Sequence, residues 1–388
     1  TFLKSEIQWG GDRRNYYLTY YIISFILIFF SIITFFLSKK IIQYLTISLS
    51  SIFFSFYLFE GYLTYHNYFL PHEKIYKKNT GIKWDKRTKF EIYNDLKKID
   101  SEITVNRGLP DFFWEPNSNY EIFPLGGISN IKTIHCNENG YFSIYNSDRY
   151  GFNNPDKEWD SQEIEFLLVG DSFTHGACVN KPNDIGSVLR TLSNKSVLNL
   201  GFGGNGPMLE YATLREYLRP NVKNVLWVFY ENDAGPIPAF ASLSPNGLRL
   251  RNYLDDLSYT QNLKLKQKEI DELLNNLISD QYDKTLEKTK FNFFKKSVSF
   301  LKLSNTRERL NNYLPKRFRP KLKGYVQPPL PVEFKEILEL AKTLSEQNNS
   351  KFYFIYLPDF HRYDKESKWI IEKFDDSNYK SLIKIISE

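Results

Sequence analysis

The chain has 388 residues, which is more than one ordinary domain needs, and its 42% apolar and 25% charged residues are typical of a globular protein. Its net charge of +6 is spread over Lys-rich stretches without any nucleic-acid-binding motif, so we expect a solvated basic surface, compatible with anionic lipid, and no nucleic-acid partner. Cys136 and Cys178 have no CxxC or His-rich surroundings, which argues against zinc. They could pair only in an oxidising compartment, and the sequence leaves their pairing open.

Two uncharged apolar stretches lie near the N-terminus, at about 16–37 and 41–59, and each is about long enough to cross a bilayer. Only Ser38, Lys39 and Lys40 separate them, so we expect a transmembrane helical hairpin within residues 1–60. Neither stretch has a polar face, which argues against the alternative, a pair of buried core helices. A cleaved signal peptide is disfavoured because its apolar core would be shorter.

The charges beside these stretches leave the membrane topology open. Lys39 and Lys40 favour a cytoplasmic turn and an outward C-terminal domain, whereas Lys4, Arg13 and Arg14 favour the opposite orientation.

Residues 61–160 form a polar, turn-rich region that we interpret as a linker with a β-hairpin. The hairpin is expected around Asn139-Gly140, a pair that favours a type I′ turn.

From residue 161 to 388 the pattern alternates between strands and helices, which predicts an α/β domain with a parallel sheet. Strands are expected at about 164–169, 196–200, 222–230 and 351–357. Helices are expected from 185, behind the cap candidates Asn183 and Asp184, at about 207–218, and from 334 to 344. Residues of about 240–325 read as a Lys- and Asn-rich, largely helical insertion.

Polar or glycine-rich motifs follow each of the four predicted strands, and the carboxyl ends of parallel strands share one edge of a sheet. These motifs are Gly170-Asp171-Ser172, Asn199 to Gly206, Glu231-Asn232-Asp233, and Asp359 with His361. Each is a weak signal alone, since a Ser after a strand is usually a helix cap and Asn-Asp is usually a turn. Together they predict a serine nucleophile, Ser172, with the backbone N–H groups of Ser172 and Gly204 and the Asn232 amide as oxyanion donors.

In these blocks the chain resembles the SGNH (GDSL-like) hydrolase family over roughly 160–388. The resemblance implies a flavodoxin-like three-layer αβα fold, acyl-ester chemistry at Ser172, a supporting role for Asp171, oxyanion roles for Gly204 and Asn232, and no metal or cofactor. The chain departs from the family at Tyr230, where the family usually has glycine two places before the asparagine.

The general base is the weak point of the resemblance, because the family supplies it from an Asp-x-x-His block after a fifth strand. His66 and His72 lie beside the second apolar stretch, His135 lies in the hairpin, and His175 more plausibly shapes the pocket than accepts the proton. His361 follows the fourth strand, and Asp359 is one residue too close to it for the family pattern. The chain begins at Thr1 and ends inside an apolar-periodic stretch, so we expect a C-terminally truncated domain whose base lies beyond Glu388, with His361 as the base if the chain is complete.

The combined expectation is a membrane-anchored esterase or O-acyl(acetyl)transferase of the bacterial inner membrane that acts in the periplasm on an acylated envelope or extracellular glycan. Two alternatives stay open: a lipase or small-ester esterase at the membrane surface, and an inactive SGNH-fold binding or assembly protein. The acyl group, the acceptor and the oligomeric state are not predicted.

Overall fold

The computed structural model describes residues 2–8, 14–69, 71–106, 121–234, 245–313, 330, 333–358 and 377–387. The chain divides into two compact units. The first unit comprises residues 1–70 and 293–319, and the second comprises residues 71–292 and 320–388.

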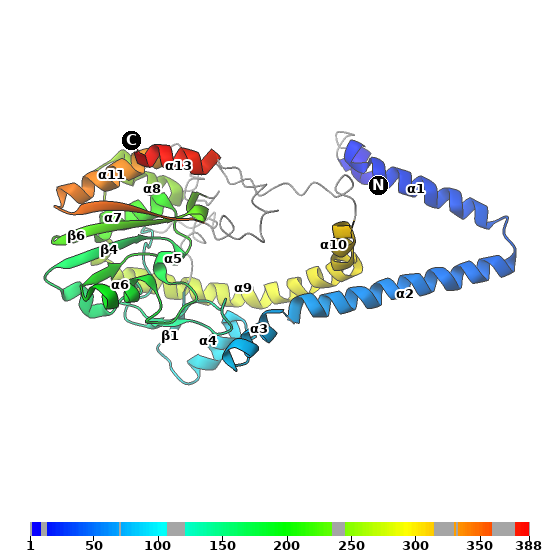
Figure 1. Ribbon diagram of the computed structural model, residues 1–388, viewed down its shortest axis with the longest axis horizontal. Helices are drawn as coiled ribbons and strands as arrows, with labels where there is room; N and C mark the ends of the chain where they lie inside the picture. Colours follow the sequence, from blue (N-terminus) through cyan, green and yellow to red (C-terminus); the bar gives the residue numbers. More distant parts are fainter. Residues whose placement is uncertain are drawn as a thin grey trace. The chain divides into compact units, whose positions relative to one another are not determined.

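The first unit is helical. After a short π-helical turn, η1 (Leu3–Gln8), it contains α1 (Arg14–Thr34), α2 (Lys39–Phe69), the end of α9 (Gln267–Leu301) and α10 (Ser304–Tyr313) (Figure 1). One helix of the described chain, over Lys39–Tyr65, is long and apolar enough to cross a membrane, and none of its most apolar window is buried. The apolar part of α1, Tyr20–Thr34, is shorter. The two expected stretches are therefore both helical, but a single helix meets the length of a span.

Helix α10 begins on a carboxylate of α2. Glu60 is fully buried and accepts hydrogen bonds from the backbone N–H groups of Asn305 (3.1 Å) and Thr306 (2.7 Å), which belong to the first turn of α10. The hydroxyl of Tyr57 donates to the carbonyl of Leu301 at 2.9 Å, and its ring lies 5.7 Å from that of Phe300. Because the first N–H groups of a helix have no partner within the helix, Glu60 acts as a cap supplied by another helix.

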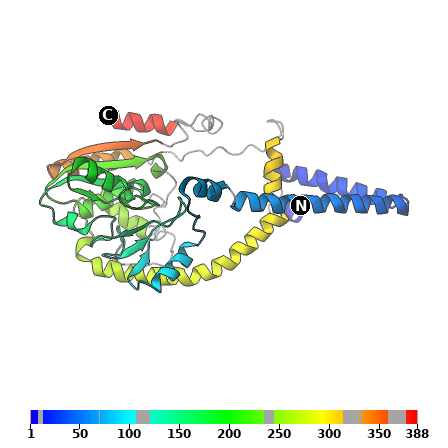
Figure 2. The ribbon, with the colours of Figure 1, turned by 60° about the horizontal axis from the view of Figure 1, so that its bottom comes forward.

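The second unit contains a four-stranded parallel sheet with the order β5-β4-β6-β7. The strands are β4 (Ile164–Gly170), β5 (Val197–Asn199), β6 (Val222–Tyr230) and β7 (Lys351–Leu357). All four lie where the alternating pattern predicted them, and β7 forms one edge of the sheet next to β6 (Figure 2). The α/β class with a parallel sheet is thereby confirmed.

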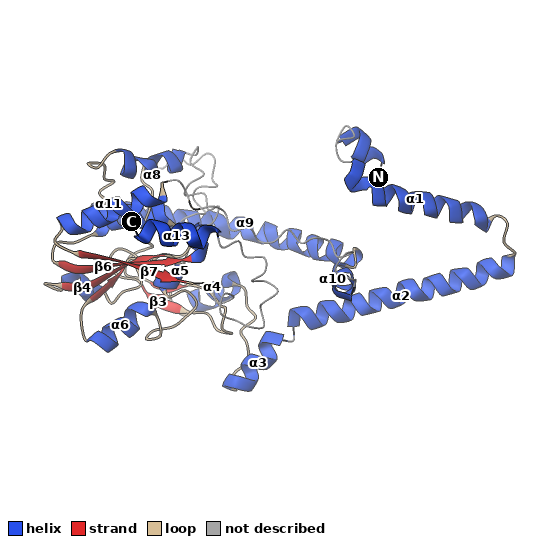
Figure 3. Ribbon diagram, turned by 45° about the horizontal axis from the view of Figure 1, so that its top comes forward, coloured by secondary structure: helices blue, strands red, loops and turns tan. Residues whose placement is uncertain are grey.

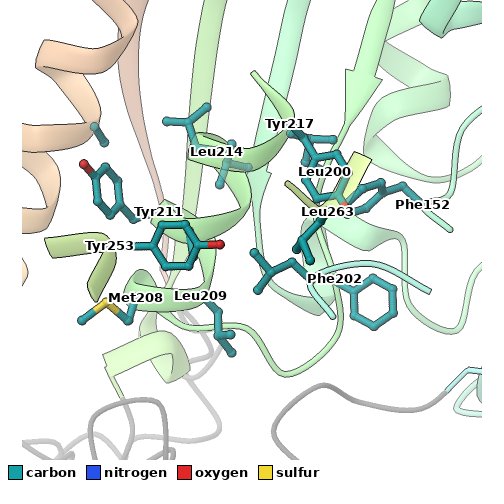
Figure 4. Close-up of a cluster of buried hydrophobic side chains, with 14 of the residues drawn as sticks. Phe152, Leu200, Phe202, Met208, Leu209, Tyr211, Leu214, Tyr217, Tyr253 and Leu263 are labelled. Carbon is teal, nitrogen blue, oxygen red and sulfur yellow. The ribbon is translucent and has the colours of Figure 1, made fainter. Parts of the chain in front are cut away.

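Helices cover both faces of this sheet, as a parallel sheet requires. Helices α7 (Pro207–Tyr217) and α11 (Phe334–Gln347) lie on one face, and α6 (Ile185–Ser193) lies on the other (Figure 3). Helix α6 starts at the predicted cap, because Asp184 accepts from the N–H of Ser187 at 2.9 Å. The main core is built around α7 and includes Phe152, Leu200, Phe202, Met208, Leu209, Tyr211, Leu214, Tyr217, Tyr253 and Leu263 (Figure 4).

A second, smaller sheet lies in the region expected to be a linker with a β-hairpin. Its strands β1 (Ile103–Val105), β2 (Lys132–Ile134) and β3 (Ile144–Asn146) pair in that order, β1 with β2 parallel and β2 with β3 antiparallel. The strands β2 and β3 form a hairpin, but Gly140 alone of the Asn139-Gly140 pair has a positive φ (87°), so the connection is not the expected tight type I′ turn. The intervening loop is held by side chains instead, including Asn137, which accepts from the N–H of Gly140 at 2.9 Å.

The remaining elements complete the second unit. They are α3 (Pro71–Thr80), α4 (Lys89–Lys97), η3 (Asp156–Asp160), α5 (Ser172–His175), η4 (Glu231–Ala234), α8 (Pro245–Asp255), η5 (Leu263–Leu265) and α13 (Ser377–Ser387), together with most of α9. Helix α4 starts with a capping box formed by Thr88 and Glu91.

Candidate active site

Ser172 is the first residue of the short helix α5, directly after β4. Asp171 precedes it and caps the helix, since its carboxylate accepts from the N–H of Phe173 at 2.8 Å. The same carboxylate accepts a 3.1 Å hydrogen bond from the Ser172 hydroxyl. Gly176 ends the turn in the left-handed conformation (φ 77°). The sequence Gly-Asp-Ser thus places one hydroxyl at the carboxyl end of a buried strand.

The glycine-rich turn after β5 lies directly against the turn that carries Ser172. A Cβ at Gly201 would lie 2.6 Å from the backbone nitrogen of His175, so only glycine permits the two turns to approach so closely. Gly204 has φ 85°, a conformation that favours glycine. Gly203 lies between them, and its N–H donates to Nδ1 of His175 at 3.1 Å. Ser172 and Gly204 line the same pocket, as the predicted roles require.

The third motif follows β6. Asn232 lies in η4, the 3-10 turn that begins at the residue after β6 ends, but its side chain lies outside the described part of the structure. The neighbouring Asp233 is buried and accepts from the N–H of Tyr230 at 2.7 Å, which closes the turn. The backbone of Asn232 is therefore at the expected edge of the sheet, and its role as an oxyanion donor stays a prediction.

A pocket of about 620 Å³ lies over Ser172. Its lining comes from two parts of the second unit. The carboxyl ends of β4, β5 and β6 and the segments that follow them contribute Ser172, Phe173, Ala177, Cys178, Gly203, Gly204 and Tyr230. The small-sheet region, residues 89–146, contributes Lys89, Asn106, His135, Cys136 and Glu138. Its volume lies within the range of small-molecule sites, roughly 300–1,000 Å³. The region predicted to be a linker with a β-hairpin therefore supplies part of the pocket.

A disulfide joins the two contributions. Cys136 in the β2–β3 loop is bonded to Cys178, six residues after the nucleophile. Asn139 donates from Nδ2 to the carbonyl of Cys178 at 3.0 Å, and Asn180 accepts from the N–H of Ile144 at 3.0 Å. The open question of the two cysteines is thus answered, because they pair and attach the small sheet to the nucleophile segment.

Two histidines lie close to Ser172, and sequence reasoning had placed only His175 near the pocket. The rings of His135 and His175 are 4.4 Å apart. Burial lowers the pKa of His135 to about 3, helped by the charge of Lys89, and burial lowers the pKa of His175 well below its ordinary value. Both imidazoles are therefore neutral near pH 7.

Neither imidazole bonds to the nucleophile. Within the described residues, Asp171 is the hydrogen-bond acceptor of the Ser172 hydroxyl, and no histidine nitrogen contacts it. His361 and Asp359 lie outside the described residues, as do the side chains of His66 and His72. The general base therefore stays a prediction.

Three buried carboxyl groups lie behind the nucleophile turn. Burial raises the pKa of Asp171, Glu210 and Asp233, and the mutual repulsion of the three groups raises the values of Glu210 and Asp233 further. The folded protein therefore disfavours the ionised form of these three carboxyl groups. Over the described chain, no group of three or more His, Cys, Asp or Glu side chains is arranged to hold a metal ion.

The loop of residues 147–155 packs against the site through side-chain hydrogen bonds. The sequence does not predict this supporting role. Asp148 is fully buried and accepts from the Trp159 indole (2.7 Å) and from Nδ2 of Asn154 (2.8 Å). Asn154 also accepts from the N–H of Asn199 at 2.8 Å, and Asn153 donates to the carbonyl of His175 at 2.9 Å. The loop thus connects the end of β5 to the nucleophile turn. Its Asn and Asp residues read as turn formers, and that is the only signal the sequence carries.

Comparisons with known proteins add little. No protein-family description and no curated protein matches the chain. Two solved structures with which it shares similarity are AlinE4, described as an SGNH-hydrolase family esterase, and a point mutant of the same esterase. Each alignment has 18% sequence identity, covers 32% of this chain and 74% of that chain, and has a TM-score of 0.17.

Proposed function

We propose that the protein is an SGNH-type serine esterase or O-acyltransferase. The observation that carries this proposal is the convergence of Ser172 and Gly204 in one pocket at the carboxyl edge of a parallel sheet. In the reaction, the Ser172 oxygen attacks the ester carbonyl and its proton passes to the general base that the family resemblance predicts. The backbone N–H groups of Ser172 and Gly204 and the Asn232 amide stabilise the oxyanion.

The cycle then runs through an acyl-serine. The bond between the carbonyl carbon and the alcohol oxygen breaks, and the alcohol leaves with the proton from the base. Water or a sugar hydroxyl next attacks the acyl-serine, which gives hydrolysis or transfer and restores the Ser172 hydroxyl.

A glycan substrate and a membrane-anchored, periplasmic location belong to the same proposal. Polar and aromatic side chains line the pocket, and this lining fits a sugar better than a lipid chain. The Cys136–Cys178 disulfide fits an oxidising compartment. The apolar helix over Lys39–Tyr65, with its exposed side chains, fits an anchor in the bacterial inner membrane.

The test is labelling of the full chain in detergent with a fluorophosphonate probe, together with turnover of p-nitrophenyl acetate. The wild type should be labelled at Ser172 and should turn over the ester. Ser172→Ala should do neither, while Ser187→Ala, a serine in α6 that does not line the pocket, should do both. A wild type that is neither labelled nor active would favour the inactive binding protein. The hydrogen bond of Ser172 to Asp171, rather than to an imidazole, is the observation that supports this alternative.

A further inference from the structure

The pocket over Ser172 has an aromatic wall that the ester chemistry does not use. Phe173 directly follows Ser172, lines the pocket and has 46% of its surface exposed. Its ring lies 4.0 Å from the ring of Tyr230, with 31° between the two planes. Tyr230 occupies the position at which the chain departs from the resembled family, so this wall is a feature of this chain.

The small-sheet region supplies polar groups to the same pocket. His135 presents a neutral imidazole, which can donate or accept a hydrogen bond without carrying a charge. Lys89 donates from Nζ to the carbonyl of Asn106 at 2.9 Å, which places a cation in the lining, and the exposed carboxylate of Glu138 adds an acceptor. The pocket thus has an aromatic face together with neutral and charged hydrogen-bonding groups.

The lining that the structure describes has almost no aliphatic surface. Ala177 is the only aliphatic side chain among these residues, with no Leu, Ile, Val or Met. A long acyl chain would therefore find little to cover it, whereas burial of an aliphatic chain depends on removing such surface from water. A pyranose has one face of C–H groups and an edge of hydroxyls, which matches a flat ring beside polar side chains.

The disulfide fixes the polar groups of the small-sheet region next to the segment that carries Ser172 and Phe173. Cys136 and Cys178 are both part of the lining, and their bond connects the loop that carries His135 and Glu138 to the segment that carries Ser172. A binding site of this kind loses little entropy on binding because its parts are already fixed.

We propose that Phe173, supported by Tyr230, together with His135, Lys89 and Glu138, forms a sugar-binding subsite beside Ser172. The subsite holds the alcohol part of the ester, or the acceptor in a transfer, with one sugar ring stacked on Phe173. This inference rests on the proposed function for the identity of Ser172 as nucleophile, but the binding of sugar can be measured without turnover.

The test uses the full chain in detergent with the Ser172→Ala substitution, so that no ester is consumed. An array of bacterial envelope oligosaccharides, with and without O-acetyl groups, should identify bound sugars, and isothermal titration should then give their Kd. Adding Phe173→Ala should weaken binding about tenfold, as expected from the loss of one aromatic contact. Phe173→Trp should retain it, and Tyr353→Ala, which removes a ring exposed to 45% on β7 outside the pocket, should change nothing.

The two proposals fail in different ways. Sugar binding that depends on Phe173, without any turnover by the enzyme with Ser172 intact, would overturn the esterase function and keep the subsite. Turnover of p-nitrophenyl acetate without binding of any oligosaccharide, or with binding that Phe173→Ala leaves unchanged, would overturn the subsite and keep the esterase.

Discussion

Loss of the hydrogen bond between Gly203 and His175 should lower the kcat of ester turnover, although neither residue reacts with the substrate. The N–H of Gly203 donates to Nδ1 of His175, and the next residue, Gly204, supplies a predicted oxyanion donor. In His175→Leu the acceptor is lost while an apolar side chain of similar size remains. In His175→Asn the side-chain oxygen occupies about the position of Nδ1, so the acceptor is kept.

The size of the effect follows from the loss of this half-buried bond. His175 is fully buried, and its Nε2 has no hydrogen-bond partner within the described residues, so the substitution removes one bond only. A fully buried N–H without an acceptor costs about 1–3 kcal/mol, which is an upper bound for the half-buried Gly203, and the turn relieves this cost by moving. A shift of an oxyanion donor by about 1 Å lowers kcat about a hundredfold.

The assay is the kcat of p-nitrophenyl acetate turnover for both variants in detergent, with the melting temperature measured in parallel. We expect His175→Leu to lose about a hundredfold in kcat, with kcat/KM falling equally because the loss lies in the transition state. We expect His175→Asn to stay within about tenfold of the wild type, since the donor keeps its acceptor. Equal losses in both variants would refute the reasoning, because the ring's contacts with Phe202 and Tyr145 rather than the hydrogen bond would then be responsible.

Three further outcomes are expected. Glu216→Ala should lower the free energy of unfolding by about 2–6 kcal/mol in urea titrations, because it leaves the buried N–H groups of Gln261 and Leu263 without their acceptor, and a loss below about 1 kcal/mol would contradict this. The loss of stability caused by His175→Asn should shrink as the pH falls from 7 to 5. Below about pH 6.5 the unfolded wild type gains a proton at His175 that the folded protein does not bind, so the stability of the wild type falls by up to about 1.4 kcal/mol per pH unit, whereas the variant has no such group. Melting temperatures of both proteins at the two pH values check this, and a constant difference between them would count against it. The kcat/KM for p-nitrophenyl esters should fall steeply from acetate to octanoate, because the described lining offers little aliphatic surface, and a rise with chain length would support a lipase instead.

The sheet could be predicted from the sequence because its signals are local. Apolar runs such as 222–230 and 351–357 need no distant partner to be recognised, and β6 and β7 occupy these positions. The cap at Asp184 is a signal of the same kind, since it lies within three residues of the N–H that it accepts from. The placement of Ser172 and Gly204 in one pocket could be predicted from these strands, because the ends of parallel strands share one edge of the sheet.

The rest of the pocket depends on contacts between residues far apart in the chain, which local patterns do not report. The disulfide joins residues separated by 42 positions, and it brings His135 beside His175. Asn154 and Asn199, 45 residues apart, are connected by two hydrogen bonds. A polar, turn-rich composition is equally compatible with a linker and with such a supporting loop, so the sequence predicts the β2–β3 hairpin but neither β1 nor the supporting role of residues 147–155.

The capping of α10 by Glu60 has a practical consequence for separating the catalytic part from the apolar helix. A shortened protein that begins after residue 60 would leave the N–H groups of Asn305 and Thr306 without their carboxylate and would uncover Phe300, which packs on Tyr57. Both changes favour aggregation of a protein otherwise freed from its most apolar segment. A soluble fragment for crystallisation therefore calls for two cuts, one that removes α1 and α2 and a second that removes the end of α9 with α10.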